Sequence, residues 1–192
     1  EQLAGPTHDV AAMRQVLQEK WGFKPDHIYS LVNAQATHKN ILKALNDLKS
    51  RSQAGDHVLI YFSGHGTSAQ HKSQGTAYPL PHHTGGFIPY DYSHDKIPKK
   101  GKAREVEQAL RNSLIVGKWH LRPLVAELEQ DRDLTVVIDS CYSQYATRTL
   151  ATRANLTRTT RNVALPFSVD MSEIEAEKGR LDDEVTPPYP YQ

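Results

Sequence analysis

Two short runs of strand-forming residues constrain the fold of this chain, because each is apolar on both faces. The first is HVLIYF at 57–62, followed by SGHGTS, and the second is LTVVID at 134–139, followed by SCYSQ. A strand that is apolar on both faces has to be covered by helices on both sides, as in parallel sheets. The two runs therefore predict an α/β fold with a mainly parallel central sheet between two layers of helices.

Helical patterns surround the two runs, as such a sheet requires. Apolar residues recur at helical spacing over 8–21, and WGFKP then ends the pattern. Thr37 is in position to cap a second helix, whose apolar face carries Ile41, Leu42, Leu45 and Leu48. A third helix is predicted over 118–130, with Pro123 in its first turns. Strands that alternate with helices favour right-handed crossovers and parallel pairing.

The remaining segments give weaker signals. HIYSLV at 27–32 is rich in strand formers, and the Gly-, Pro- and Ser-rich region 64–102 predicts long loops with a short hairpin near GGFIPYDY. The 151–192 region is first rich in Thr and Arg and then acidic and Pro-rich, which is typical of an exposed loop and an extended tail.

Composition excludes several classes of function. The net charge of +1 gives no bulk attraction to nucleic acid or to an anionic membrane, and no apolar run approaches the roughly 20 residues of a bilayer span. The chain has one cysteine in 192 residues, so it forms no internal disulfide and no Cys-rich zinc motif. A cytoplasmic location is the expectation that fits this use of cysteine.

That single cysteine, Cys141, and His65 both follow an apolar strand, where parallel sheets carry their ligand sites. An imidazole next to a thiol can take its proton and generate a thiolate nucleophile. The glycines at 64 and 66 leave room for a substrate backbone and for N–H groups that face an oxyanion. Two other interpretations remain open, since Cys141 can be a small core residue and His65 a structural histidine.

The two blocks HVLIYFSGHGT and LTVVIDSCYSQYATR resemble the catalytic blocks of caspase-like cysteine peptidases, in the metacaspase and bacterial orthocaspase branch. LAGPTHDVAAMRQVLQEKWGF, GGFIPYDY and LIVGKWHLRPLVAELEQ are similar to other segments of that family, so that the resemblance extends over 1–150. It implies a caspase-like three-layer α/β/α sandwich. It also implies that Cys141 is the nucleophile, that His65 is the general base and acid, and that the main-chain N–H groups of Gly66 and Cys141 form the oxyanion hole.

The resemblance also implies a substrate preference for Arg or Lys at P1, because this branch of the family binds that side chain with carboxylates. The corresponding positions are Asp9, Asp139 and Ser63, with Asp91 in IPYDY as a weaker candidate. A buried guanidinium needs paired carboxylate acceptors. Each residue also has a structural interpretation: Asp9 as a helix cap, Asp139 as a strand-end acceptor, Ser63 as a turn residue and Asp91 as a solvated loop carboxylate.

Two departures from the family pattern affect these expectations. Tyr142 and Gln144 replace the family's usual His and Gly after the cysteine, which bears on the oxyanion geometry. The 67–90 loop has no acidic residue, so calcium dependence is not expected, and no other cofactor or metal is implied. The remaining histidines have no spacing typical of metal ligands and are expected in loops; they are His71, His82, His83 and His94.

The resemblance divides the chain into a 1–150 catalytic region, lacking the family's first strand, and a 151–192 region that is an incomplete version of its C-terminal half. We therefore expect a complementary chain or segment to complete the groove. Self-processing is a hypothesis, because basic residues follow the cysteine where related enzymes are cut; the candidates are Arg148, Arg153, Arg158 and Arg161. These arginines also suit a solvated basic loop.

The leading interpretation is thus a cysteine endopeptidase that cuts protein or peptide substrates after Arg or Lys through an acyl-enzyme. An inactive caspase-fold scaffold or binding module is the alternative, since fold does not imply function. A third possibility within the same clan is a legumain-like or clostripain-like peptidase, which would differ in its P1 preference.

Overall fold

The computed structural model describes residues 5–68, 80–81, 84–98 and 101–140. The helices are α1 (Gly5–Glu19), α2 (His38–Arg51), α3 (Ala103–Arg111) and α4 (Arg122–Leu128), with short helical turns η1 (Pro25–His27), η2 (Asn33–Gln35), η3 (His94–Lys96) and η4 (Gly117–Leu121). The strands are β1 (His57–Ser63), β2 (Gly66–Ser68), β3 (Gly85–Phe87), β4 (Ile115–Val116) and β5 (Asp133–Asp139).

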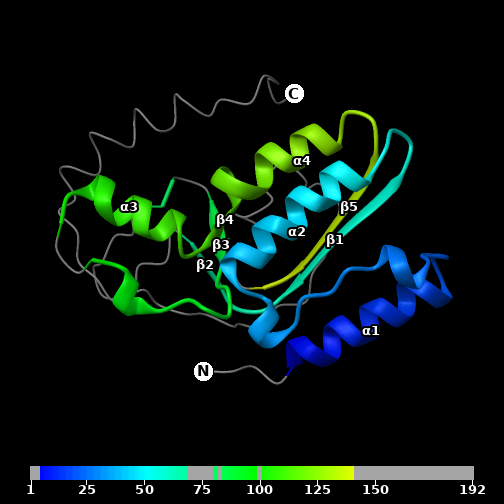
Figure 1. The fold of residues 1–192 in the computed structure, drawn as a ribbon, viewed down its shortest axis with the longest axis horizontal. Helices are drawn as coiled ribbons and strands as arrows, with labels where there is room; N and C mark the ends of the chain where they lie inside the picture. Colours follow the sequence, from blue (N-terminus) through cyan, green and yellow to red (C-terminus); the bar gives the residue numbers. More distant parts are fainter. Residues whose placement is uncertain (1–4, 69–79, 82–83, 99–100, 141–192) are drawn as a thin grey trace.

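The two apolar runs form the parallel pair β1–β5, with His57 opposite Asp133 at one end and Ser63 opposite Asp139 at the other. Residues alternate between the faces of this pair. Val58, Ile60 and Phe62 face α2 and α4, and the even-numbered residues of β5 share that face. Figure 1 shows α2 and α4 on one side of the pair and α1 on the other, so the predicted layered α/β arrangement is confirmed.

Apolar packing fixes α2 and α4 on the strand pair. Leu128 is fully buried beside Val58 and Leu124, and Ile138 packs in a neighbouring cluster with Phe87. At roughly 1.5–3 kcal/mol for each large apolar side chain, burial of these residues provides the main stabilisation of this layer. A further cluster lies under α3, and its buried members are Leu80, Ile97, Val106, Leu110, Leu114 and Val116.

A second, antiparallel sheet has the order β2–β3–β4. Gly66 of β2 pairs with Phe87 of β3, and Phe87 pairs with Ile115 of β4. The predicted hairpin near GGFIPYDY was therefore wrong in its pairing. GGF is a strand, but its partners are distant in sequence, because the loop composition that suggested a turn does not specify which strand is paired.

The ends of the helices follow the sequence signals. α1 ends at Glu19, and Gly22 follows it with a φ of 72°, which suits glycine. The Phe23 N–H then donates to the Leu17 carbonyl at 3.0 Å. Thr37 caps α2 by accepting a hydrogen bond from the Asn40 N–H at 3.2 Å. Proline stands in the first turn of α4, as predicted for Pro123.

Two segments differ from the sequence expectations. Residues 28–32 form no strand despite their composition, although Ile28 and Val32 have extended backbone angles, because no described strand pairs with them. Sequence analysis did not predict helix α3, since AREVEQALR shows only Ala103, Val106, Ala109 and Leu110 as apolar positions and follows the polar stretch DKIPKKGK. Its buried face nevertheless covers the cluster around Leu110.

Within the described residues, no helix has the length and apolar character needed to cross a bilayer.

Candidate active site

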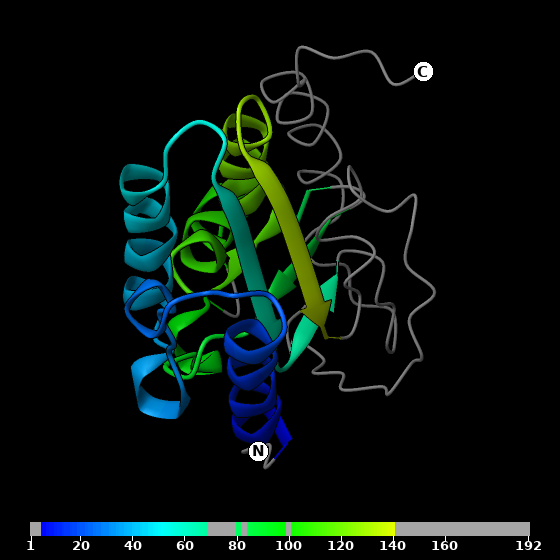
Figure 2. The ribbon, with the colours of Figure 1, turned by 90° about the vertical axis from the view of Figure 1, so that its right-hand side faces the viewer.

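The carboxyl ends of β1 and β5 lie side by side, and the chemistry predicted from the sequence converges there. Ser63 pairs with Asp139 in the parallel register, and the Gly64 N–H donates to the Asp139 carbonyl at 3.2 Å. Figure 2 shows the two strands running side by side to the same edge of the sheet. The segment that leads to Cys141 is therefore anchored next to the segment that leads to His65 as far as Ser140.

Helix α1 contributes a third residue to this edge. The Ser63 hydroxyl donates to Asp9 Oδ2 at 2.8 Å, across 54 positions of sequence. Because side chains alternate along a strand, Ser63 and Asp139 project to the face opposite Phe62 and Ile138, which is the face that α1 covers. The structure thus brings together Asp9, Ser63 and Asp139, two carboxylates and a hydroxyl that suit a cationic side chain.

His65 lies at the turn between the parallel pair and the antiparallel sheet. Its carbonyl accepts a hydrogen bond from the Ile88 N–H at 3.0 Å, and Gly66 begins β2 directly after it. The turn is tight on one side: a Cβ added to Gly64 would meet the ring of Phe62 at 3.2 Å. Phe62 in turn stacks on Phe87 with 4.1 Å between ring centroids, so packing restricts where the His65 backbone can lie.

Several predicted residues lie outside the described part of the chain. These are Cys141, Tyr142, Gln144 and the arginines at 148, 153, 158 and 161, together with His71, His82 and His83. His94 is described, and its ring packs edge-on against Tyr92 with 5.1 Å between centroids. In the described ranges no three His, Cys, Asp or Glu side chains gather as a set of metal ligands. The expectation about calcium stays a prediction.

Asp91 takes part in a different interaction from the one considered for it. Its Oδ1 accepts a hydrogen bond from the His38 N–H at 2.8 Å, in the first turn of α2. The Asp91 carbonyl accepts one from Lys96 Nζ at 2.9 Å. Its carboxylate therefore binds a helix N-terminus, where N–H groups lack intrahelical partners.

A histidine pair connects α2, α3 and η4, and no sequence pattern pointed to it. The His38 and His120 rings lie edge to face at 5.8 Å, and His38 Nε2 donates to the Arg111 carbonyl at 3.1 Å. The Val116 N–H donates to His120 Nδ1 at 2.9 Å. Burial, followed by repulsion from His38 and Arg111, lowers the pKa of His120 from 6.5 to about 4. His120 is therefore neutral at pH 7.

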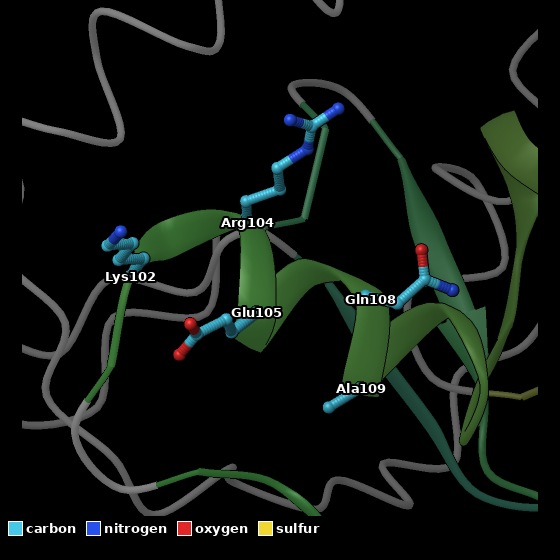
Figure 3. A pocket seen from close by; sticks show the side chains of 5 residues that line it. All are labelled: Lys102, Arg104, Glu105, Gln108 and Ala109. Atoms are coloured by element: carbon cyan, nitrogen blue, oxygen red, sulfur yellow. The ribbon is translucent and has the colours of Figure 1, made fainter.

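A hollow on the surface of α3 is a poor candidate for chemistry. It is lined by Lys102, Arg104, Glu105, Gln108 and Ala109, all from one helix and its cap, and Figure 3 shows their side chains pointing in different directions. Figure 1 places α3 at the end of the molecule away from α1. The edge that carries Asp9, Ser63 and His65 is therefore the better site.

A parallel strand pair between helix layers, with a histidine and a carboxylate cluster at its carboxyl edge, defines a caspase-like α/β domain. The family model described as metacaspase, peptidase C14 domain, matches residues 1–150. The chain belongs to this family, as the resemblance of its two blocks had indicated.

Curated relatives carry the same family name. Metacaspase-4 from Arabidopsis thaliana is 38% identical over 74% of this chain and 30% of its own length. Metacaspase-6 from the same plant is 29% identical over 74% of this chain and 34% of its own length. Metacaspase-1 from Schizosaccharomyces pombe is 28% identical over 51% of this chain and 26% of its own. The chain therefore spans about a third of the length of these relatives.

Proposed function

We propose that this chain carries the catalytic machinery of a cysteine endopeptidase that cuts proteins after Arg or Lys. The observation that supports it most is the hydrogen bond between Ser63 and Asp9 beside Asp139, at the edge where His65 lies and from which Cys141 follows. Asp9, Ser63 and Asp139 come from α1, β1 and β5, which are far apart in sequence, and they lie together at this edge. If each had only a structural role, they would not need to lie in the same place. Family membership supports the peptidase chemistry.

The carboxylate cluster suits a basic P1 side chain. A guanidinium presents several N–H donors in a plane, so it gains from two carboxylates that accept from different directions. The Ser63 hydroxyl donates to Asp9 Oδ2, which restricts the orientation of that carboxylate. Lysine would bind as a point charge between Asp9 and Asp139.

The reaction would proceed through an acyl-enzyme. His65 takes the proton of the Cys141 thiol, and the thiolate attacks the scissile carbonyl carbon while main-chain N–H groups of Gly66 and Cys141 stabilise the oxyanion. The C–N bond then breaks, and His65 gives its proton to the leaving amine. Water, deprotonated by His65, attacks the thioester and releases the acid, which restores the thiol.

Two further features belong to the same proposal. Cleavage of its own basic loop at Arg148, Arg153, Arg158 or Arg161 follows from the same P1 preference. A further chain or segment would complete the substrate groove, and no metal is required for the chemistry.

The test is cleavage of fluorogenic peptides with Arg, Lys, Asp or Asn at P1 by the full-length protein, with calcium and with chelator. The control is Cys141→Ala. We expect turnover after Arg and Lys that is lost in the variant and unaffected by chelator. Preference for Asp or Asn would refute the role of the carboxylate cluster, and absence of turnover under every condition would favour the scaffold alternative.

A further inference from the structure

A four-residue segment, 88–91 (IPYD), connects the turn that carries His65 with the start of α2; we refer to it as the strap. At one end the Ile88 N–H donates to the His65 carbonyl at 3.0 Å. In the middle the Tyr90 N–H donates to the Ala36 carbonyl at 2.9 Å. At the other end Asp91 Oδ1 accepts from the His38 N–H at 2.8 Å.

The strap has little freedom between these points. Pro89 is buried and has a fixed φ, and its carbonyl accepts the Tyr92 N–H at 3.1 Å. Ile88 packs against the cluster under α3. Because the segment is short and has hydrogen bonds at Ile88, Tyr90 and Asp91, we expect a displacement at Asp91 to reach Ile88, whose N–H donates to the His65 carbonyl.

Asp91 places a negatively charged side chain at the N-terminus of α2. Its carboxylate faces the N-terminus of α2, a helix of 14 residues whose first N–H groups carry partial positive charge. Thr37 caps the same helix through the Asn40 N–H, so the helix end has two independent side-chain partners. The Thr37 bond is local to the helix, whereas the Asp91 bond ties the helix to the strap.

We infer that Asp91 is a positioning residue for His65 and acts through the strap, and that it is not a member of the P1 pocket. The inference rests on the proposed peptidase function for its catalytic consequence. Its structural part, the coupling of the Asp91 bond to the Ile88–His65 bond, does not depend on activity. A basic P1 side chain would be bound by Asp9 and Asp139, with Asp91 engaged at α2.

Three substitutions in the full-length protein separate the possibilities. Asp91→Ala removes the bond to α2, Asp91→Asn keeps an oxygen that accepts it, and Thr37→Ala weakens the same helix end without touching the strap. Amide hydrogen exchange at Ile88 is the readout that is independent of turnover. We expect it to be about tenfold faster in Asp91→Ala and unchanged in the other two variants.

Kinetics with an Arg peptide give the second readout. We expect Asp91→Ala to lower kcat roughly tenfold with KM changed less than about twofold, because a shift of the base costs rate and leaves P1 binding intact. We expect Asp91→Asn to approach the unsubstituted protein. A higher KM in both Asp91 variants would overturn the inference and return Asp91 to the pocket. The same loss in Thr37→Ala would reduce Asp91 to a stabiliser of α2.

The inference can still be tested if Asp91→Ala does not fold or if the unsubstituted protein shows no turnover. If Asp91→Ala does not fold, Lys96→Met removes only the bond to the Asp91 carbonyl, and we expect it to change Ile88 exchange and kcat in the same direction. If the unsubstituted protein shows no turnover, the proposed function fails while the exchange comparison still decides whether the strap couples α2 to His65.

Discussion

The stability of this domain should fall on acidification because of His120. Its Nδ1 accepts the Val116 N–H at 2.9 Å, and this bond requires an unprotonated nitrogen. The titratable groups that act on its ring are His38 on α2 and Arg111 on α3. Arg111 in turn pairs with Glu107 at 3.1 Å and stacks on Trp119 at 4.4 Å. A proton on His120 would thus break a part-buried hydrogen bond and add repulsion.

The sign and size of the effect follow from the pKa. Burial, followed by the electrostatic effects of His38 and Arg111, lowers the pKa of His120 from 6.5 to about 4, so between these values the unfolded chain binds a proton that the folded chain does not. The contribution is complete above pH 6.5 and is lost as the pH falls to about 4. Allowing for the part of the ring that solvent reaches, we expect a loss of about 2–3 kcal/mol in the free energy of unfolding.

Urea unfolding of the unsubstituted protein and of His120→Asn at several pH values between 7 and 4 measures this loss. The Asn Oδ1 occupies the place of Nδ1 and accepts from Val116 without titrating, so every other group contributes equally to both proteins. We expect the stability of the two to converge, or to cross, as the pH falls. A difference that stays constant from pH 7 to pH 4 would refute the reasoning, as would an NMR titration of His120 near 6.5.

Two further predictions concern the pocket and the core. Ser63→Ala should lower kcat/KM for Arg peptides about fivefold, equivalent to about 1 kcal/mol, because Asp9 loses the donor that orients it; an unchanged value would mean that the bond plays no part in specificity. Leu128→Ala should lower the free energy of unfolding by about 2–5 kcal/mol, because the side chain is 0% exposed. Val16→Ala is the control, since Val16 is 42% exposed and its loss should cost under about 0.5 kcal/mol. Equal costs for the two substitutions would show that packing of α4 contributes little to stability.

Sequence patterns predicted where helices and strands lie in this chain better than they predicted which strands pair. The apolar runs of β1 and β5, the Thr37 cap and the glycine after α1 each depend on a few adjacent residues, and each was predicted correctly. The strand composition of 27–32 and the GGF strand illustrate the limit, since pairing depends on residues elsewhere in the chain. His120 had no signal, because a buried neutral histidine is indistinguishable in sequence from an exposed one.

In the candidate site, sequence reasoning likewise predicted which side chains are present better than it predicted their partners. Asp9, Ser63 and Asp139 were proposed together through family resemblance, and the period of two along β1 and β5 explains why two of them share the face that α1 covers. Asp91 was grouped with them because carboxylates are alike in sequence, yet its partner is the N–H of His38. A carboxylate already held by a helix N-terminus has less to offer a substrate guanidinium, since its charge is partly balanced. Under the proposed function the acidic residues near this edge therefore divide into two roles: Asp9 and Asp139 would attract a basic side chain, and Asp91 would fix the backbone from which His65 acts.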